Sequence, residues 1–217
     1  MATALIGSAR PRTKTAAVDP AAAMKAEALY LEAVNADEDG RPDDAYMLLR
    51  RAAALNPADP YIRASIAEYT VALPSADSLM IEEAYRAFAD RYEAGPTDQH
   101  NAFVYATMAQ NLGRTDDLIA IWERLDSLMP SRTDPAMNLA TALIGRYAKT
   151  LDTADFNRAI GIYNRLEQAT GPSLQLASRK IGAYMMRKDT ASIVSEINAL
   201  AASAPADINT NIIAGHL

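Results

Sequence analysis

The sequence predicts an all-α protein, an α-solenoid of helix–turn–helix repeats, because two residue patterns recur in step along the chain. One is a proline that closes a helix shortly before the next helix starts, and it occurs at Pro57, Pro96, Pro130, Pro172 and Pro205. The other is a small residue ten positions after each proline, at Ala67, Ala106, Ala140, Gly182 and Gly215, with Ala33 in the same place in the first unit. The prolines are 39, 34, 42 and 33 residues apart, so each unit can hold two helices and their turns.

The stretch GRPDDAYMLLRRAAALNPADP, residues 40–60, shows how the helix ends are specified. Gly40 can end the preceding helix in the left-handed conformation. From Ala45 onward the apolar residues follow the helical period. Pro57 cannot continue this helix, and Asp59 predicts the N-cap of the next one. One helix is therefore expected to end and another to begin within a few residues.

A third pattern places a residue of the second helix about twelve positions before each proline, at Ala45, Ala84, Leu118, Ala159 and Ile193. In the fourth unit strict spacing would select Ile160, but Ala159 has the small side chain and puts Tyr163 four residues later. The second and fourth units are longer than the others. Their extra residues fall in TVALPSADSLMIEE and RYAKTLDTADFNR, which predicts insertions in the turn between the two helices.

These patterns resemble the tetratricopeptide repeat family over residues 21–217. The turn glycines Gly40 and Gly113 add to the resemblance, as do bulky second-helix residues at Leu49, Phe88, Trp122, Tyr163 and Ile197. The sequence departs from the family where Arg91, Leu125, Leu166 and Leu200 replace a usual small residue, and where the large first-helix aromatic is missing. The resemblance implies a right-handed solenoid whose first helices line a concave face. The spacing also resembles that of envelope repeat proteins from Bacteroidetes-type bacteria.

Residues 1–19 are interpreted as a separate segment, and residues 20–217 as an array of about five repeats plus the start of a sixth. The stretch MATALIGSA is apolar and its basic residues follow it, whereas a signal peptide has its charges first. Gly7 and Ala9 nevertheless have the spacing of a signal-peptidase site. The segment is therefore either a flexible arm or a signal-peptide remnant. The second interpretation favours the periplasm or cell envelope, with the cytoplasm as the alternative.

The residue types argue against an enzyme. The chain has no cysteine, and its two histidines, His100 and His216, are far apart in the sequence. Phosphate-binding and nucleophile motifs are absent from the sequence. Acidic pairs such as Glu82 and Glu83 fall at the expected start of a second helix, where the helix dipole favours them. We therefore expect no catalytic residues, no cofactor and no metal.

Charge and hydropathy argue against two further classes of protein, general nucleic-acid binders and membrane-spanning proteins. The net charge of −6 opposes general nucleic-acid binding, which requires a basic surface. No apolar run approaches the ~20 residues that a membrane-spanning helix needs. What remains is a scaffold that binds a peptide or helix of a protein partner in its concave groove. Projection of the first helices by the family pattern places these side chains in the groove: Tyr61, Glu68, His100, Phe103, Thr107, Gln110, Asn111, Met137, Asn138, Thr141, Arg179, Lys180, Met186 and Arg187.

At the basic end of this set, Arg179, Lys180 and Arg187 are expected to attract an acidic partner segment. The alternative is that they pair with nearby acids such as Asp189 and Glu196.

The chain ends within the expected sixth unit, two residues after Gly215. Either the sequence is the N-terminal part of a longer protein, or its short last helix caps the array. A docking module of a longer enzyme or transport component, with its active domain beyond residue 217, is the alternative function. Self-association through the open C-terminal end is the third.

Overall fold

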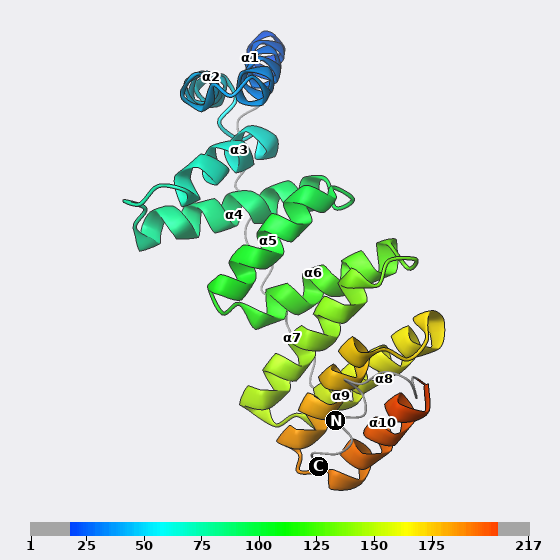
Figure 1. Cartoon of the computed structure of the whole chain (residues 1–217). Coiled ribbons are helices and arrows are strands. Elements are labelled where there is room, and N and C mark those ends of the chain that lie inside the picture. Colours follow the sequence, from blue (N-terminus) through cyan, green and yellow to red (C-terminus); the bar gives the residue numbers. More distant parts are fainter. Residues whose placement is uncertain (1–17, 204–217) are drawn as a thin grey trace, which may run out of the picture. The chain divides into compact units, whose positions relative to one another are not determined.

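The computed structural model describes residues 18–203, and in that range the chain consists of ten helices without any strand (Figure 1). This confirms the predicted all-α repeat fold. The helices are α1 (Pro20–Glu38), α2 (Pro42–Leu55), α3 (Pro60–Val71), α4 (Ser78–Ala94), α5 (Gln99–Asn111), α6 (Thr115–Leu128), α7 (Asp134–Thr150), α8 (Thr153–Thr170), α9 (Leu174–Met186) and α10 (Thr190–Ser203).

The helices follow one another as five pairs, each with a first helix of odd number and a second helix of even number. The prolines end the pairs regularly. Pro57, Pro96, Pro130 and Pro172 each lie two residues after the last residue of a second helix. The predicted cap at Asp59 is confirmed, because its carboxylate accepts hydrogen bonds from the backbone N–H groups of Tyr61 and Ile62 at 2.9 and 3.1 Å.

The predictions for the two ends of the chain fall largely outside the described residues. The apolar start and its signal-peptidase spacing lie in residues 1–17, and Pro205, Gly215 and the sixth unit lie in residues 204–217. Asp19, at the end of the predicted arm, is described: its side chain accepts a hydrogen bond from the N–H of Ala21 and caps α1. No helix between residues 18 and 203 is both long enough and apolar enough to cross a membrane.

The chain divides into two compact units, which we call the N-terminal unit (described residues 18–96, α1–α4) and the C-terminal unit (described residues 97–203, α5–α10). In the N-terminal unit α1 and α2 pack through alanines that are at most 2% exposed: Ala26, Ala33, Ala36, Ala45 and Ala52. Alanine at these positions lets the two helix backbones approach closely. The core of the C-terminal unit includes larger side chains, among them Leu125, Leu143 and Tyr163.

Most of the repeat positions are buried. The bulky second-helix residues Leu49, Phe88, Trp122, Tyr163 and Ile197 are all buried. So are Ala33, Ala67, Ala106 and Ala140 in the first helices, and the fully buried Ala159 confirms the repeat register chosen in the fourth unit. Gly182 differs, because a Cβ atom added there would have no neighbour within 4 Å. The small residue in the fifth repeat is therefore not required by a close helix contact.

The two insertions are accommodated differently. In the second repeat, residues 72–77 form a loop between α3 and α4, as expected. In the fourth repeat the prediction of a longer turn is wrong. Helices α7 and α8 have 17 and 18 residues, whereas α5 and α6 have 13 and 14, and only Leu151 and Asp152 separate α7 from α8. Leu151 makes this short turn in the left-handed conformation, with φ of 58°.

Candidate functional site

The candidate site is a hollow of about 300 Å³ in the C-terminal unit, between α5, α6 and α7, which we call the α5–α7 pocket. Its lining comes from two successive first helices and the second helix between them. The lining residues are Ala109, Gln110, Gly113, Thr115, Leu118, Trp122, Asn138, Thr141, Ala142, Gly145 and Lys149. The pocket thus includes three side chains that the sequence places on the concave face: Gln110, Asn138 and Thr141.

The floor of the pocket is apolar and packs against a neighbouring aromatic ring. Trp122 and Leu118 contribute from α6, and both are buried. Phe103 of α5 packs edge-on against the Trp122 ring, with 5.2 Å between the ring centroids and 73° between the planes. Phe103, predicted to contact a partner, is therefore half-buried and holds the pocket floor in place.

The rim is polar. Gln110, Asn138 and Lys149 border the pocket from α5 and α7. An amide side chain both donates and accepts hydrogen bonds, whereas an ammonium group only donates. Such a rim suits a ligand that presents N–H and C=O groups together, as a peptide backbone does.

The long α7 helix extends the pocket wall. Lys149 lies near the end of α7, beyond the point that α5 reaches in the preceding repeat, whereas Gly145 corresponds to Asn111, the last residue of α5. A Cβ atom added at Gly145 would meet nothing within 4 Å, so the wall is open at this point. The sequence pattern does not predict that Lys149 lines a pocket, because it places residues 146–158 in a turn.

An ion-pair network fixes α7 against its neighbours. The Arg146 guanidinium donates to both oxygens of Asp155 at 2.7 Å and to Asp116 at 2.7 Å, which joins α7 to α8 and α6. Asp155 is only 4% exposed. The hydrogen bonds from Arg146 lower the pKa of Asp155 below its usual value, although burial acts in the opposite direction. This network holds the helix that carries Asn138, Gly145 and Lys149.

The structure does not gather the other predicted residues of α5 into the pocket. His100, Thr107 and Asn111 are exposed and do not line it. The Thr107 hydroxyl donates to the backbone C=O of Phe103 at 2.9 Å, within its own helix.

Two predicted residues, Tyr61 and Glu68, lie on α3 in the N-terminal unit, and both are exposed. The Arg91 guanidinium stacks on the Tyr61 ring, with Cζ 3.6 Å from the centroid. A Cβ atom at Gly95 would lie 2.7 Å from the Arg91 Nη1, so the glycine leaves room for this stack. The contact explains why arginine replaces the usual small residue at position 91.

The predicted basic cluster requires a correction. Arg179 is exposed, but Lys180 is only 2% exposed, and its ammonium group donates to Glu167 at 2.9 Å and pairs with Glu196 at 2.6 Å. Burial lowers the Lys180 pKa, but the hydrogen bonds to Glu196 and Glu167 outweigh it and raise the pKa above its usual value. The alternative interpretation, pairing with Glu196, is therefore correct for Lys180.

The reason lies in the helical period of α9. Lys180 lies among the buried residues Leu176, Ala177 and Ala183, on the side that faces α8 and α10. Arg187 follows the helix, is exposed, and stacks on the Phe156 ring at 4.7 Å from the centroid. Asp189, the other expected partner, caps α10 by accepting hydrogen bonds from the N–H and hydroxyl of Ser192. The exposed basic set is thus reduced to Arg179 and Arg187.

Metal-ligating groups do not cluster in the described part of the chain. Between residues 18 and 203 no three His, Cys, Asp or Glu side chains are arranged to hold a metal ion.

No family model and no curated protein sequence matches this chain. Its structure is similar to solved structures at low sequence identity. YrrB, described as a TPR protein with an unusual peptide-binding site, is 12% identical with a TM-score of 0.61, and the match covers 87% of this chain and 91% of YrrB. A tetratricopeptide repeat protein from Parabacteroides merdae is 13% identical with a TM-score of 0.57, covering 88% and 71%. MamA from Desulfovibrio magneticus is 11% identical with a TM-score of 0.55, covering 85% and 95%.

At these identities the similarity concerns the fold alone. It agrees with the helix pairs and with the buried repeat positions described above. The link to envelope proteins of Bacteroidetes-type bacteria stays a prediction. The chain is a helical-repeat protein with the tetratricopeptide repeat fold.

Proposed function

We propose that this chain is a non-enzymatic protein-interaction scaffold that binds an extended peptide of a partner in the α5–α7 pocket. The observation that carries the proposal is the lining of that pocket, where polar side chains from two successive first helices surround the apolar floor of Trp122 and Leu118. Binding pockets commonly combine a mostly apolar lining with a few placed polar groups, and volumes of ~300–1,000 Å³ are usual.

The peptide would use the rim and the floor in different ways. Gln110 on α5 and Asn138 on α7 would bind backbone N–H and C=O groups of the peptide. One peptide side chain would enter over Trp122, and Lys149 would favour a carboxylate at one end. YrrB is described as having a peptide-binding site, which supports a peptide ligand for this fold.

The other exposed residues predicted for the concave face extend the proposal. His100, Thr107, Asn111, Arg179 and Arg187 would contact further parts of a bound segment in the C-terminal unit. Tyr61 and Glu68 would be contacts of the N-terminal unit in their own right. Lys180 is not included, because its charge is buried between two glutamates.

Gly145→Leu tests the proposal by filling the pocket without removing any side chain. The matched control is Gly161→Leu, because Gly161 is also an exposed glycine within a helix, and a Cβ atom there meets nothing within 4 Å. Both changes replace glycine by a better helix former and are expected to raise helix stability by about 0.8–1 kcal/mol. Only Gly145 lines the pocket.

The measurement starts with a random decapeptide library selected on the wild-type protein, followed by fluorescence anisotropy with the most enriched peptide. We expect Gly145→Leu to weaken binding at least about tenfold, or 1.4 kcal/mol, while Gly161→Leu binds like the wild type. Equal affinities for all three proteins would show that the peptide does not use this pocket. A library without any enriched peptide would contradict the proposed function itself.

A further inference from the structure

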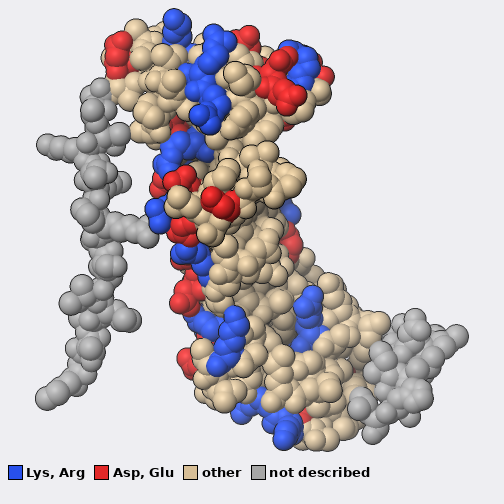
Figure 2. Space-filling view, turned by 90° about the vertical axis from the view of Figure 1, so that its left-hand side faces the viewer, with Lys and Arg blue, Asp and Glu red and all other residues tan. Residues whose placement is uncertain are grey.

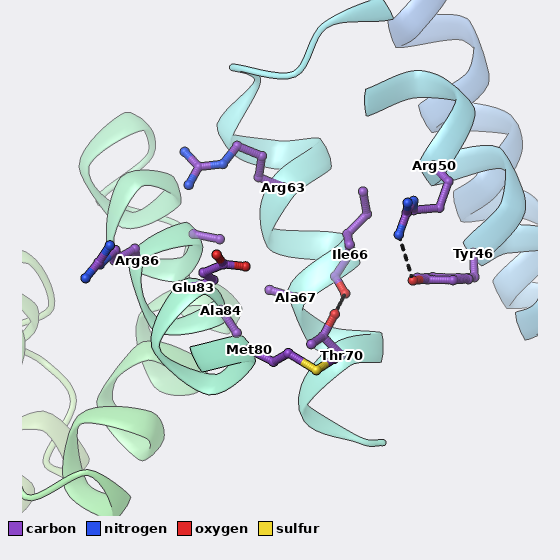
Figure 3. Close-up of a pocket in the computed structure, with 11 residues that line it drawn as sticks. Tyr46, Arg50, Arg63, Ile66, Ala67, Thr70, Met80, Glu83, Ala84 and Arg86 are labelled. Atoms are coloured by element: carbon purple, nitrogen blue, oxygen red, sulfur yellow. Dashed lines mark hydrogen bonds between the residues drawn. The ribbon is translucent and has the colours of Figure 1, made fainter. Parts of the chain in front are cut away.

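The N-terminal unit contains a second hollow, of about 480 Å³, between the second helices α2 and α4 with α3 at its base (Figure 3). We call it the α2–α4 pocket. Three arginines, Arg50 of α2, Arg63 of α3 and Arg86 of α4, line it together with a single carboxylate, Glu83. Figure 3 shows that these side chains come from three helices around the hollow.

The base of this pocket is apolar. Ile66 and Ala67 of α3 and Met80 and Ala84 of α4 line it, and the alanines are buried. The Thr70 hydroxyl donates to the backbone C=O of Ile66 at 2.9 Å, so this lining hydroxyl is already bonded within its own helix. The pocket therefore offers an apolar base that can take one side chain, below a border of charged groups.

At the corresponding place in the C-terminal unit an ion pair links the two second helices. Between α6 and α8, Arg158 donates to Glu123 at 2.5 Å. Arg50 has the repeat position of Glu123, one residue after the bulky second-helix residue, and Glu83 has the position of Arg158, one residue before the small one. The N-terminal unit thus has the same pair with its charges exchanged, but Arg50 does not bond to Glu83. It donates to the Tyr46 hydroxyl at 3.3 Å.

The arginines differ in how they are neutralised. Arg63 pairs with Asp90, and Arg86 pairs with Glu82 at 3.3 Å in an exposed i,i+4 pair. Exposed pairs of this kind contribute only about 0–1 kcal/mol, so a ligand carboxylate can compete for Arg86. Arg50 makes no ion pair within residues 18–203. Figure 2 shows basic side chains over the N-terminal unit, in the upper part of that view, with acidic side chains beside them.

We propose that the α2–α4 pocket is a second binding site, for an acidic peptide segment of a protein partner that carries one apolar side chain. The guanidinium groups of Arg50 and Arg86 would bind carboxylates on either side of the apolar residue, because arginine matches the carboxylate geometry with two parallel hydrogen bonds. Glu83 repels a carboxylate and so directs the acidic groups toward the arginines.

A peptide fits this site better than a longer polyanion. The chain carries a net charge of −6, which repels nucleic acid and anionic membranes, whereas a short segment meets only the local arginines. The site is independent of the α5–α7 pocket, since it lies in another unit and uses other helices. It also lies on the side of α3 opposite to Tyr61 and Glu68, as the helical period requires.

The test uses a fluorescent heptapeptide, Gly-Asp-Glu-Leu-Glu-Asp-Gly, and the full chain. Two control peptides replace all four acids by their amides or replace the leucine by glycine. We expect the acidic peptide to bind at least about tenfold more tightly than either control, with an affinity that falls as salt rises. No preference for the acidic peptide would overturn the proposal. So would binding of a single-stranded oligonucleotide or of vesicles with anionic lipid in preference to this peptide.

Three variants assign the binding to the pocket. Arg50→Glu is expected to lower the affinity at least about tenfold. Its control is Arg51→Glu, an identical charge change on the next, exposed residue of α2 that does not line the pocket, and it should change affinity by less than about threefold. Equal losses of affinity in both variants would show that the acidic peptide does not bind in the α2–α4 pocket.

Glu83→Gln provides a test that does not depend on a loss of binding. Removal of the one lining carboxylate should strengthen binding of the acidic peptide by about threefold and leave the amide peptide unaffected. A substitution that merely disturbed folding would not raise affinity. Unchanged or weaker binding of the acidic peptide by a Glu83→Gln protein with a wild-type melting temperature would contradict the proposal.

Discussion

Both units contain a cation held between two carboxylates, and Arg41 in the N-terminal unit and Lys180 in the C-terminal unit differ in burial. In the N-terminal unit Arg41 pairs with Asp39 at 3.1 Å and with Asp44 at 2.9 Å, and its side chain is 55% exposed. In the C-terminal unit Lys180 pairs with Glu167 and Glu196, and its side chain is 3% exposed. The first cluster joins neighbours in the sequence, whereas the second joins α8, α9 and α10.

This difference extends to the two units as wholes. The buried polar and charged residues in the described range are Asn101, Asp155 and Lys180, and all three belong to the C-terminal unit. There, Arg146 links α6, α7 and α8, and ion pairs link α6 to α8. The N-terminal unit relies on small residues between α1 and α2 and leaves its second helices separated by a pocket. One repeat pattern therefore supports two ways of holding successive helices together.

The largest expected effect comes from Lys180→Ala. This change leaves Glu167 and Glu196 facing a site that has lost its cation, and breaking a buried ion pair in this way typically costs about 3–5 kcal/mol. The control is Arg41→Ala, which removes a cation from between two carboxylates that stay in water, and it should leave stability nearly unchanged. Urea unfolding followed by circular dichroism measures both. Equal unfolding midpoints for the two variants would show that burial does not distinguish the clusters.

The second-largest expected effect concerns the size of the side chain at the small-residue position of the first helices. Ala33→Leu adds a branched side chain at a residue of α1 that is 2% exposed, and overpacking should lower the free energy of unfolding by about 1–3 kcal/mol. At the same repeat position in the C-terminal unit, Gly182→Ala should instead raise it by up to about 1 kcal/mol, because the new methyl group has open space and favours the helix. Thermal unfolding of both variants tests this. Destabilisation by Gly182→Ala would contradict the distinction.

The sequence predicts the helices well because their ends are specified locally. A proline, an N-cap such as Asp59 or a turn glycine acts within a few residues, and the helical period fixes the buried side of each helix. The prediction for the insertion in the fourth repeat is wrong because no such local signal marks the end of α7. No glycine or proline interrupts YAKTLDTADFNR, and Leu151 makes the turn without one.

The candidate site could be predicted only in part. Gln110 and Asn138 follow from the projection of the first helices, and both line the α5–α7 pocket. Lys149 could not be found, because its place depends on how far α7 extends. The burial of Lys180 depends on carboxylates from α8 and α10, which the sequence of α9 does not contain. Contacts between repeats therefore decide which polar residues stay available to a partner.

A smaller effect is expected at the turn within each repeat. Gly40 and Gly113 adopt the left-handed conformation with φ of 74° and 67°, and Lys188 takes the same position in the fifth repeat with φ of 57°. The left-handed conformation costs a residue with a Cβ atom about 1–2 kcal/mol, and a change to glycine removes this cost. The greater conformational freedom of glycine in the unfolded chain offsets part of the stabilisation. Lys188→Gly should therefore stabilise the protein by up to about 1 kcal/mol.

The reverse change in the N-terminal unit, Gly40→Lys, should lower the free energy of unfolding by a similar amount. No atom lies within 4 Å of a Cβ added at Gly40, so the backbone conformation alone causes the loss. Urea unfolding of both variants is the measurement. Changes of the same sign would indicate that the two turns do not share this constraint.

The smallest expected effect is a pH dependence in the N-terminal unit. The Tyr69 hydroxyl donates to Asp37 at 2.6 Å, and partial burial, this hydrogen bond and the nearby carboxylates raise the Tyr69 pKa to about 12. The unfolded chain has a tyrosine pKa of ~10. Because the folded protein holds the phenol proton more tightly, this stabilisation is complete below pH ~10 and is lost as the pH rises toward 12.

Tyr69→Phe removes the titrating group. The stability of this variant should therefore fall less between pH 8 and pH 11 than that of the wild type, by roughly 1 kcal/mol or less. Urea midpoints at the two pH values measure the difference. A larger effect than that of Lys180→Ala would contradict the contrast between the units, because an exposed contact would then outweigh a buried one.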